Sequence, residues 1–518
     1  MIINNKFISY FILFIFIFFS VLILQNDNYY FDCNYFEELH VNGCYGEVQL
    51  LLDTKQKLML LGMLVIFSFV FIYFFYSREE KNFFPIFYMI TIYFFLSYFI
   101  YFLFYPKVQL AEFDNNMFPI FEQSTSIYDI IFSSQVFLIG LLFFNLGYFI
   151  LNFSNINNFL KLDSLNSFLK IKDLNELLII SLIINFITFT FFYLINLGEI
   201  FHPIKQLKFI FVYLSVGINI FFYFNFKNNL RYLFLLPIII LILVEFFEAS
   251  LAVPFMLMLY VYFLFFSVKR KFFIIPILLI FLLGSFYNFI KDDYRKIFLP
   301  DFKIENKTYF DKEEPFNKIK AFVHVSKKKI LEIKDFKDLK EDLLYNSLFK
   351  RIFHSGRSLL IVTAKTPETV PYFNGESHKL LYVKLIPRLF WPNKPKDELG
   401  NEFGKRYKVL TEADTGTSWN MPVLNEFYVN YGLKGIIFGM FLLGNFFYVL
   451  TRFFPLNNNQ SYILIIGSII VYPLFNLESH LSQSLGNILT SFIFMIILIF
   501  FLKKIILFLN LKIIKETN

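Results

Sequence analysis

Long apolar runs recur along nearly the whole chain, and they constrain the fold more than any other feature. A helix needs about 20 mainly apolar residues to cross the roughly 30 Å hydrocarbon core of a bilayer. About twelve segments meet this requirement, at roughly 7–24, 57–76, 83–105, 130–152, 177–197, 208–226, 232–247, 251–268, 272–290, 431–450, 461–475 and 485–502. The sequence therefore predicts an all-α polytopic membrane protein.

The composition agrees with this class and excludes a single soluble core. Hydrophobic residues make up 57% of the chain, aromatic residues 22%, and the mean hydropathy is +0.58. The net charge of +8 could indicate a nucleic-acid partner, but the lysines and arginines lie mostly between apolar runs. A bilayer explains that placement better, so we expect membrane lipid as a partner and no nucleic acid.

The seventh and eighth runs are separated only by "EFFEAS", so they could form a helical hairpin or one broken span. The first run could resemble a signal peptide. Its apolar stretch is too long for one and no small-residue cleavage site follows, so we expect a membrane helix there.

Basic residues of the short loops favour one side of the membrane. If the spans alternate, that side carries Lys6, Arg78, Lys81, Lys161, Lys170, Lys172, Lys227, Arg231, Lys269, Arg270, Lys271, Arg452, Lys503 and Lys504. By the positive-inside rule this side is cytoplasmic, so both termini are expected in the cytoplasm.

Cys33 and Cys44 then share the first outside loop, where an oxidising compartment would allow a disulfide. Chance co-location of two unpaired cysteines is the alternative.

The longest stretch without a predicted span is 291–430. The chain thus divides into 1–290 with nine spans, 291–430 as one large extracytoplasmic loop between the ninth and tenth spans, and 431–518 with three spans and a cytoplasmic tail. Helical spacing of apolar residues predicts an amphipathic helix from about Lys328 to Leu360, which would lie on a membrane or cover a core. At its end, "RIFHSGR" places Arg351, His354 and Arg357 on one side.

Chemistry-bearing residues concentrate in that loop and its borders. All six histidines (His40, His202, His324, His354, His378 and His480) and both tryptophans (Trp391 and Trp419) map to the outer face or its edge. The chain has no Walker loop, dinucleotide fingerprint or zinc-type His/Cys cluster, so we expect neither ATP nor another cofactor, and no metal site.

Four segments of the loop share an order and spacing with a known family. They are "RIFHSGR", "TPETVPYFNGES", "IPRLFWPNKPKDELGNEFGKRY" and "TSWNMPVLNEFYVNYGLKGIIFGMFLLGN", which together run from Arg351 to Asn445. This arrangement resembles the outer-loop signature of bacterial O-antigen and oligosaccharide repeat-unit polymerases, the Wzy-like family. Relatives often have a glycine before the glutamate of the last segment, where this chain has Asn425 before Glu426.

The resemblance implies a glycosyltransferase of the bacterial inner membrane. It would join undecaprenyl-pyrophosphate-linked repeat units at the outer face, passing the growing chain to a newly flipped unit and releasing undecaprenyl pyrophosphate. The products would be O-antigen or related surface polysaccharide. The sequence leaves open which sugars are joined and whether a polysaccharide chain-length regulator is a further partner.

The residue types in the loop suit this reaction. A leaving pyrophosphate needs fixed cations, and arginine forks match phosphate oxygens bidentately. Three prolines restrict the backbone around Arg388, which with Lys394 would meet phosphate or anchor headgroups, while Trp391 would stack on a sugar or lie among headgroups. We predict catalytic roles for Arg388, Arg351, His354 and Glu426, and substrate-binding roles for Arg357, Trp391, Lys394, Glu376, His378, Glu478 and His480.

Several alternatives stay open from the sequence. The acceptor hydroxyl needs a base, and spacing does not favour any one of His354, Glu376, His378 and Glu426. Glu478 with His480, or Glu245 with Glu248, could serve a substrate or simply face water at the ends of spans. An O-antigen ligase shares the polytopic build and the lipid-linked donor. A flippase or transporter of lipid-linked oligosaccharide would be expected to show internal repeats, which are not clear here.

Overall fold

The computed structural model describes residues 16–21, 23, 54–76, 85–103, 127–153, 174–194, 205–226, 229–247, 252–269, 274–298, 315–332, 352–386, 391, 393–395, 398–415, 417–452 and 478–516. These residues form helices and turns, with no strand among them. The predicted helical class of the protein is therefore confirmed for the part of the chain described.

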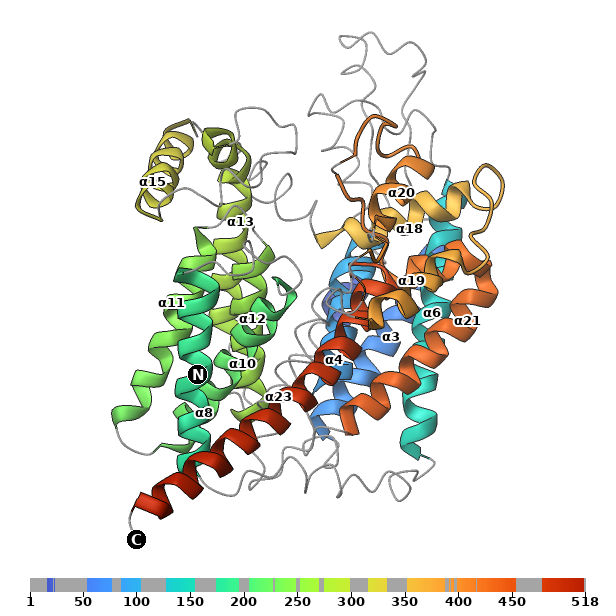
Figure 1. The fold of residues 1–518 in the computed structure, drawn as a ribbon. Coiled ribbons are helices and arrows are strands. Elements are labelled where there is room, and N and C mark those ends of the chain that lie inside the picture. The colour runs from blue at the N-terminus through green and yellow to red at the C-terminus, as the bar shows by residue number, and fades with distance from the viewer. Residues whose placement is uncertain are drawn as a thin grey trace.

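One group of helices carries the candidate site at one of its ends. It contains α3 (Thr54–Tyr76), α4 (Ile86–Phe94) with the π-helix η2 (Phe95–Phe99), α6 (Ile127–Phe153) and α21 (Val423–Arg452), and it lies on the right in Figure 1. The helices α6 and α21 touch through glycines, because a Cβ built on Gly147 would lie 2.2 Å from the carbonyl oxygen of Phe441. A Cβ on Gly444 would lie 2.1 Å from that of Phe144. Such small residues let membrane helices approach closely.

A second group of helices lies on the left in Figure 1. It contains α8 (Leu174–Ile187) with η4 (Thr188–Leu194), α10 (Lys205–Asn225), η6 (Asn229–Phe234) with α11 (Leu235–Phe246), α12 (Ala252–Lys269), α13 (Ile274–Phe298) and α15 (Pro315–Glu332). Hydrogen bonds join α8 to α10, where Ser215 and Asn219 both donate to Asn185 Oδ1, at 2.5 and 3.0 Å. These bonds satisfy polar groups in an otherwise apolar interface.

Helix α11 shows that an apolar run can supply both a buried face and an exposed face. Its buried residues are Ile238, Leu241 and Glu245, while Leu236, Ile239 and Leu243 are at least half exposed. An exposed face made of large aliphatic side chains is what a lipid-contacting helix presents. The buried Glu245 is paired with Lys208 of α10 at 3.1 Å.

The C-terminal helix α23 (Leu481–Glu516) connects the two groups. It begins beside α19 (Glu376–Leu385), and its far end lies on the side of the second group in Figure 1. Phe494 of α23 and Phe211 of α10 have ring centroids 6.4 Å apart. This helix therefore contacts the second group while its first turn contributes to the candidate site.

Six helices within the described residues are long and apolar enough to cross a membrane. They cover Lys55–Tyr73, Ile86–Leu103, Tyr128–Asn152, Lys208–Asn225, Asn229–Phe246 and Val423–Arg452. Shorter apolar helices cover Leu178–Phe191, Val253–Phe266 and Ile275–Lys291. These helices coincide with predicted runs, so a polytopic build is supported. The total of twelve stays a prediction, because 461–475 and most of 7–24 lie outside the described residues, as do Cys33 and Cys44.

The predicted amphipathic helix from Lys328 to Leu360 is wrong as a single element. Lys328 belongs to α15, which begins upstream at Pro315, whereas Leu360 belongs to α18 (His354–Lys365). A turn at Phe353 precedes α18, and the Phe353 side chain is buried. Proline at a first helical position fixes the start of α15, a signal that the apolar spacing alone did not use.

Candidate active site

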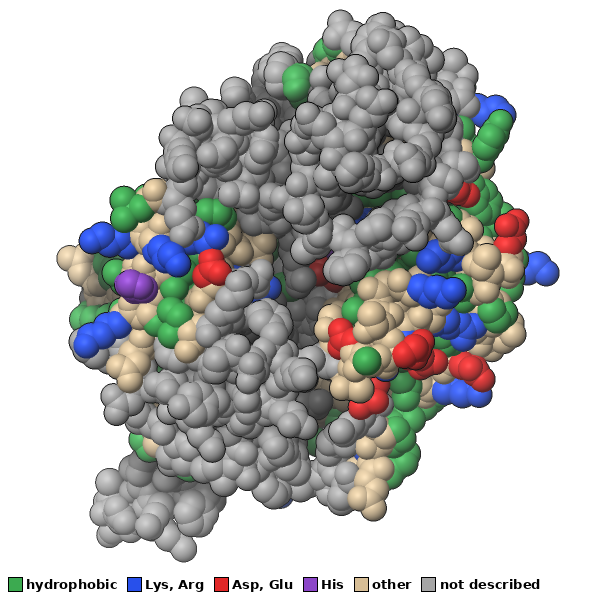
Figure 2. Space-filling view, turned by 90° about the horizontal axis from the view of Figure 1, so that it is seen from above, with side chains coloured by type: hydrophobic (Ala, Val, Ile, Leu, Met, Phe, Trp, Pro, Cys, Tyr) green, Lys and Arg blue, Asp and Glu red, His purple; other side chains and the backbone are tan. Residues whose placement is uncertain are grey.

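The segments of the large loop pack onto the end of the first group of helices. Helix α18, α19 and α20 (Leu399–Arg406) lie at this end in Figure 1, and charged side chains of both signs gather over it in Figure 2. Lys365 at the end of α18 donates to the carbonyl oxygen of Tyr407 at 2.8 Å. Burial lowers the pKa of Lys365, and Lys408 lowers it further. Burial raises the pKa of Tyr407 to about 12, although its hydrogen bond to Thr366 opposes the shift.

A sharp bend in α21 creates the short helical leg that carries the site. Gly432 has φ 59° and ψ −143°, so the helix breaks between Tyr431 and Leu433. The break releases the carbonyl of Val429 from its helical partner, and this oxygen accepts from Phe373 N at 3.0 Å. Only glycine adopts such a backbone readily. The leg Val423–Tyr431 can therefore turn away from the long membrane helix.

Glu426 lies on that leg and is fully buried. Ser377 Oγ donates to its Oε1 and the backbone N–H of Leu481 donates to its Oε2, each at 2.5 Å. Leu481 is the first residue of α23, where helical N–H groups lack intrahelical partners and the helix dipole favours negative charge. The carboxylate is thus held by two donors from separate elements.

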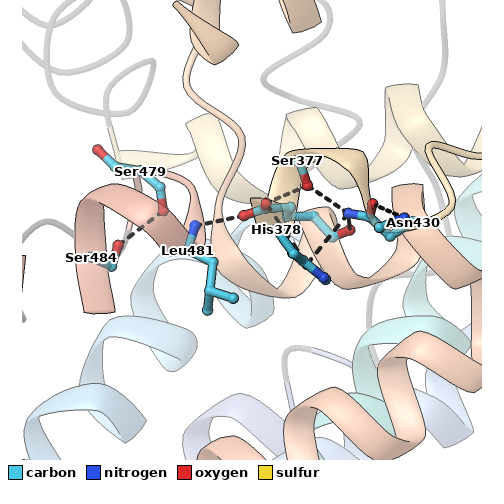
Figure 3. A network of polar contacts seen from close by, with 8 residues as sticks. Ser377, His378, Asn430, Ser479, Leu481 and Ser484 are labelled. Atoms are coloured by element: carbon cyan, nitrogen blue, oxygen red, sulfur yellow. Dashed lines mark hydrogen bonds and ion pairs between the residues drawn. The ribbon is translucent and has the colours of Figure 1, made fainter. Parts of the chain in front are cut away.

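His378 is the more accessible partner of this carboxylate. Its Nε2 lies 3.8 Å from Glu426 Oε1, and its side chain is 22% exposed while that of Glu426 is 0% exposed. Asn430 Nδ2 donates to Ser377 Oγ and to the Glu426 backbone carbonyl, both at 2.8 Å. Its contact with His378 Nε2 is longer, at 3.4 Å, and is the weakest of the three. Figure 3 shows Ser377, His378 and Asn430 together, with Leu481 on the other side.

A second polar cluster adjoins the first on the same leg. Asn425 accepts from the Tyr98 hydroxyl at 3.0 Å, and its Nδ2 donates to the Ser355 carbonyl at 3.0 Å and to Ser358 Oγ at 2.7 Å. The Tyr93 hydroxyl bonds Ser355 Oγ at 2.6 Å. An amide at position 425 therefore locks the leg to α18 and to the span that contains η2, which a glycine there would not do.

The structure brings Glu478 and His480 to this same region. Both lie within three residues before α23, and the His480 carbonyl accepts from the backbone N–H groups of Gln483 and Ser484 in its first turn. Glu478 is half-buried and close enough to Tyr93 to interact with it electrostatically. His480 is buried, with 1% exposure, so its ring could meet a substrate only after a rearrangement.

Other predicted residues lie in different surroundings. His354 Nε2 is 2.9 Å from the Asn420 carbonyl oxygen. Lys394, in the irregular segment after α19, donates from Nζ to the carbonyls of Ile386 at 2.7 Å and Lys384 at 3.3 Å. These carbonyls lie at the end of α19, where a basic side chain satisfies groups without helical partners. Trp391 is 36% exposed.

The remaining predicted residues divide between the surface and the part not described. Glu376 is exposed in the first turn of α19, and Arg357 is half-buried on α18. Arg351 and Arg388 lie outside the described residues, so their roles stay predictions.

Sequence reasoning nominated Glu426 and His378 but missed the residues that hold them, Ser377 and Asn430. One signal was available, because Asn430 lies four residues after Glu426 and therefore on the same helical face. No comparable local signal joins Ser377 or Leu481 to Glu426. Within the described ranges, no group of three or more His, Cys, Asp or Glu could hold a metal ion.

The fold and this site define a helical, polytopic membrane protein with a buried carboxylate network at one end of its helices. Residues 356–510 match the family model described as O-antigen polysaccharide polymerase Wzy, which confirms the resemblance to Wzy-like polymerases. The matched region contains the network residues Ser377, His378, Glu426, Asn430 and Leu481. Comparisons with curated proteins and with solved structures give no match.

Proposed function

We propose that this protein polymerises undecaprenyl-pyrophosphate-linked oligosaccharide units at the outer face of the inner membrane. The sugar at the pyrophosphate end of the growing chain is the donor, and a hydroxyl on a new lipid-linked unit is the acceptor. A glycosidic bond forms, the bond from sugar to pyrophosphate breaks, and undecaprenyl pyrophosphate leaves. The observation that carries the proposal is the His378–Glu426 pair inside the matched region.

His378 is the base in this proposal. Its partly exposed imidazole can reach a hydroxyl, whereas Glu426 is enclosed and already accepts from Ser377 and Leu481. When neutral His378 takes the acceptor proton, the resulting imidazolium lies beside the Glu426 carboxylate, which stabilises it. Glu426 is then a positioning residue, whose carboxylate lies 3.8 Å from the imidazole.

The leaving pyrophosphate is assigned to the arginines. Arg388, with Arg351 and Arg357 as further donors, supplies planar forks for phosphate oxygens as negative charge develops. Lys394 is a weaker candidate, because its ammonium already binds two backbone carbonyls. The reaction in this form requires no divalent metal.

The test compares surface glycan length in cells that carry single variants at equal membrane abundance. We expect His378→Ala to slow polymerisation by about 10²- to 10⁴-fold, the usual contribution of a general base, and to leave single repeat units. Arg388→Ala should also give short glycan. His354→Ala tests the other histidine predicted as a base, whose Nε2 lies 2.9 Å from the Asn420 carbonyl oxygen, and it should leave glycan length unchanged if His378 is the base.

Three outcomes would contradict the proposal. If the His378→Ala variant made full-length polymer at the normal rate, His378 could not be the base. Cells that lack all surface repeats after deletion of the gene would indicate a ligase or a flippase. Purified enzyme that loses activity with EDTA and regains it with magnesium would establish a metal-dependent reaction.

A further inference from the structure

Helix α15 combines three features that the reaction does not use. It carries five lysines and one carboxylate, it exposes large apolar side chains, and it packs where two apolar helices end. The apolar segment of α13 ends at Lys291 and that of α11 at Phe246. Together these features indicate that the surface of a bilayer contacts the protein at α15.

The packing places α15 at the depth of those helix ends. Phe322 lies 5.3 Å from Phe246 of α11 by ring centroids. Tyr294 of α13 donates to the Phe247 carbonyl at 2.7 Å and to the Lys318 carbonyl at 3.3 Å. The helix is therefore fixed beside the end of one helix long enough to cross a membrane, which contains α11, and the end of one shorter apolar helix, α13. Headgroups lie at the level of such helix ends.

One face of α15 is fixed by an ion pair as well as by apolar packing. Lys329 Nζ lies 3.0 Å from Asp293 Oδ2 and 5.3 Å from the Phe289 ring centroid. Val325 is buried with Ile290 and Tyr294. These contacts orient the helix about its axis, and so they determine which residues point away from the protein.

An apolar stripe lies next to this packed face. Val323 is 59% exposed and Ile330 is 54% exposed, and Ile319 precedes Val323 by one turn. Positions 319, 323 and 330 share one side of the helix, because eleven residues make about three turns. Ile319 is the least exposed of the three, at 37%.

Two exposed lysines, Lys320 and Lys327, border the stripe on the side away from the packed face. Lys328 is also exposed but lies about half a turn from the stripe. Basic side chains gather at the edge where α15 lies in Figure 2. A helix with an apolar stripe beside lysines, located at headgroup depth, has the features of an interfacial helix. Lysine stems reach along apolar surface while their ammonium groups meet phosphates.

We propose that α15 binds the surface of an anionic bilayer. Ile319, Val323 and Ile330 enter the boundary between headgroups and acyl chains, and Lys320 and Lys327 contact lipid phosphates. The occupant is the bilayer surface itself and not a soluble phosphate. This assignment is independent of the polymerase reaction, and it gives the protein a surface that gathers anionic lipids on the face where α18 to α20 lie.

The test uses the full-length protein in nanodiscs with an environment-sensitive fluorophore on Val323→Cys, in a Cys33→Ser, Cys44→Ser background. In discs that contain phosphatidylglycerol, we expect blue-shifted emission and quenching by lipids labelled near the headgroup. Replacing Lys320 and Lys327 with Gln should weaken this response by about fivefold per lysine, the size of one lysine–anionic surface contact. The matched control replaces Lys379 and Lys408, which are also exposed, with Gln.

Two results would overturn the proposal. The first is a probe equally accessible to aqueous iodide in phosphatidylglycerol and phosphatidylcholine discs. The second is a response to soluble pyrophosphate in discs without anionic lipid, because the lysines would then bind free phosphate groups. Circular dichroism of the double variant verifies that the substitutions leave the helices intact.

Discussion

At the scale of single residues, Ser377 connects the two halves of the site. Its hydroxyl donates to Glu426 and accepts from Asn430, so one oxygen links α19 to the short leg of α21. Its side chain has 1% exposure, and water cannot replace these bonds without opening the site. The buried carboxylate therefore depends on this residue for one of its two donors.

We expect Ser377→Ala to lower the free energy of unfolding by about 1.5–3 kcal/mol, the range for a hydrogen bond to a charged group. The midpoint of thermal unfolding in detergent micelles measures the effect. The control is Ser134→Ala, since Ser134 is buried but donates only to the Ile130 carbonyl of its own helix. Equal midpoints for the two variants would contradict the role of Ser377.

The sequence could nominate Glu426 and His378 by residue type but could not rank them. Their roles depend on burial and on contacts across long stretches of chain, such as the bond from Leu481 to Glu426. The pattern of apolar residues carries no information on which loop serine reaches a given carboxylate. Arg388, chosen for its position among prolines, is a prediction that the described residues do not test.

At the scale of elements, the bend in α21 is the feature that apolar spacing missed. The predicted span 431–450 begins almost at the bend, so the long leg was predicted and the short polar leg was assigned to the loop. Gly435, Gly439 and Gly444 follow Gly432 in the same segment and remain helical. Several glycines in one run therefore do not reveal which of them breaks the helix.

We expect Gly432→Ala to cost at least about 1–3 kcal/mol of stability, because an L-residue is strained at φ 59°. Its Cβ would also lie 2.7 Å from the Tyr372 hydroxyl oxygen. Polymer length should fall with stability, since the leg carries Glu426. The control is Gly62→Ala in α3, whose Cβ would meet only Leu138 at 3.7 Å, an ordinary contact. A Gly432→Ala protein as stable as this control would show that the bend tolerates a side chain.

At the scale of the whole molecule, helices of the predicted large loop and the C-terminus lie at opposite ends. Figure 1 places α15, α18 and α20 at one end and the C-terminus of α23 at the other. Apolar run length predicted most of the described membrane helices because it reflects bilayer thickness directly. It could not predict the two groups of helices or the path of α23, since these depend on packing between distant segments.

The orientation of the molecule in the membrane gives the last prediction. The positive-inside rule places the end with α19 outside and the start of η6 inside. Cysteine substitution in a Cys33→Ser, Cys44→Ser background tests this with a membrane-impermeant maleimide on spheroplasts. Tyr382→Cys should react, because Tyr382 is 74% exposed on α19. Asn229→Cys, at an exposed position that begins η6, should react only after the membrane is permeabilised.

Both cysteines should react in detergent, which controls for local accessibility. Reaction of Asn229→Cys in intact spheroplasts, with none at Tyr382→Cys, would show the opposite orientation, with α19 in the cytoplasm. His378 and Glu426 would then face the cytoplasm, where flipped lipid-linked units are not presented. Because the acceptor must enter from the side on which His378 is exposed, that single result would exclude polymerisation at the outer face even if the His378 variant were inactive.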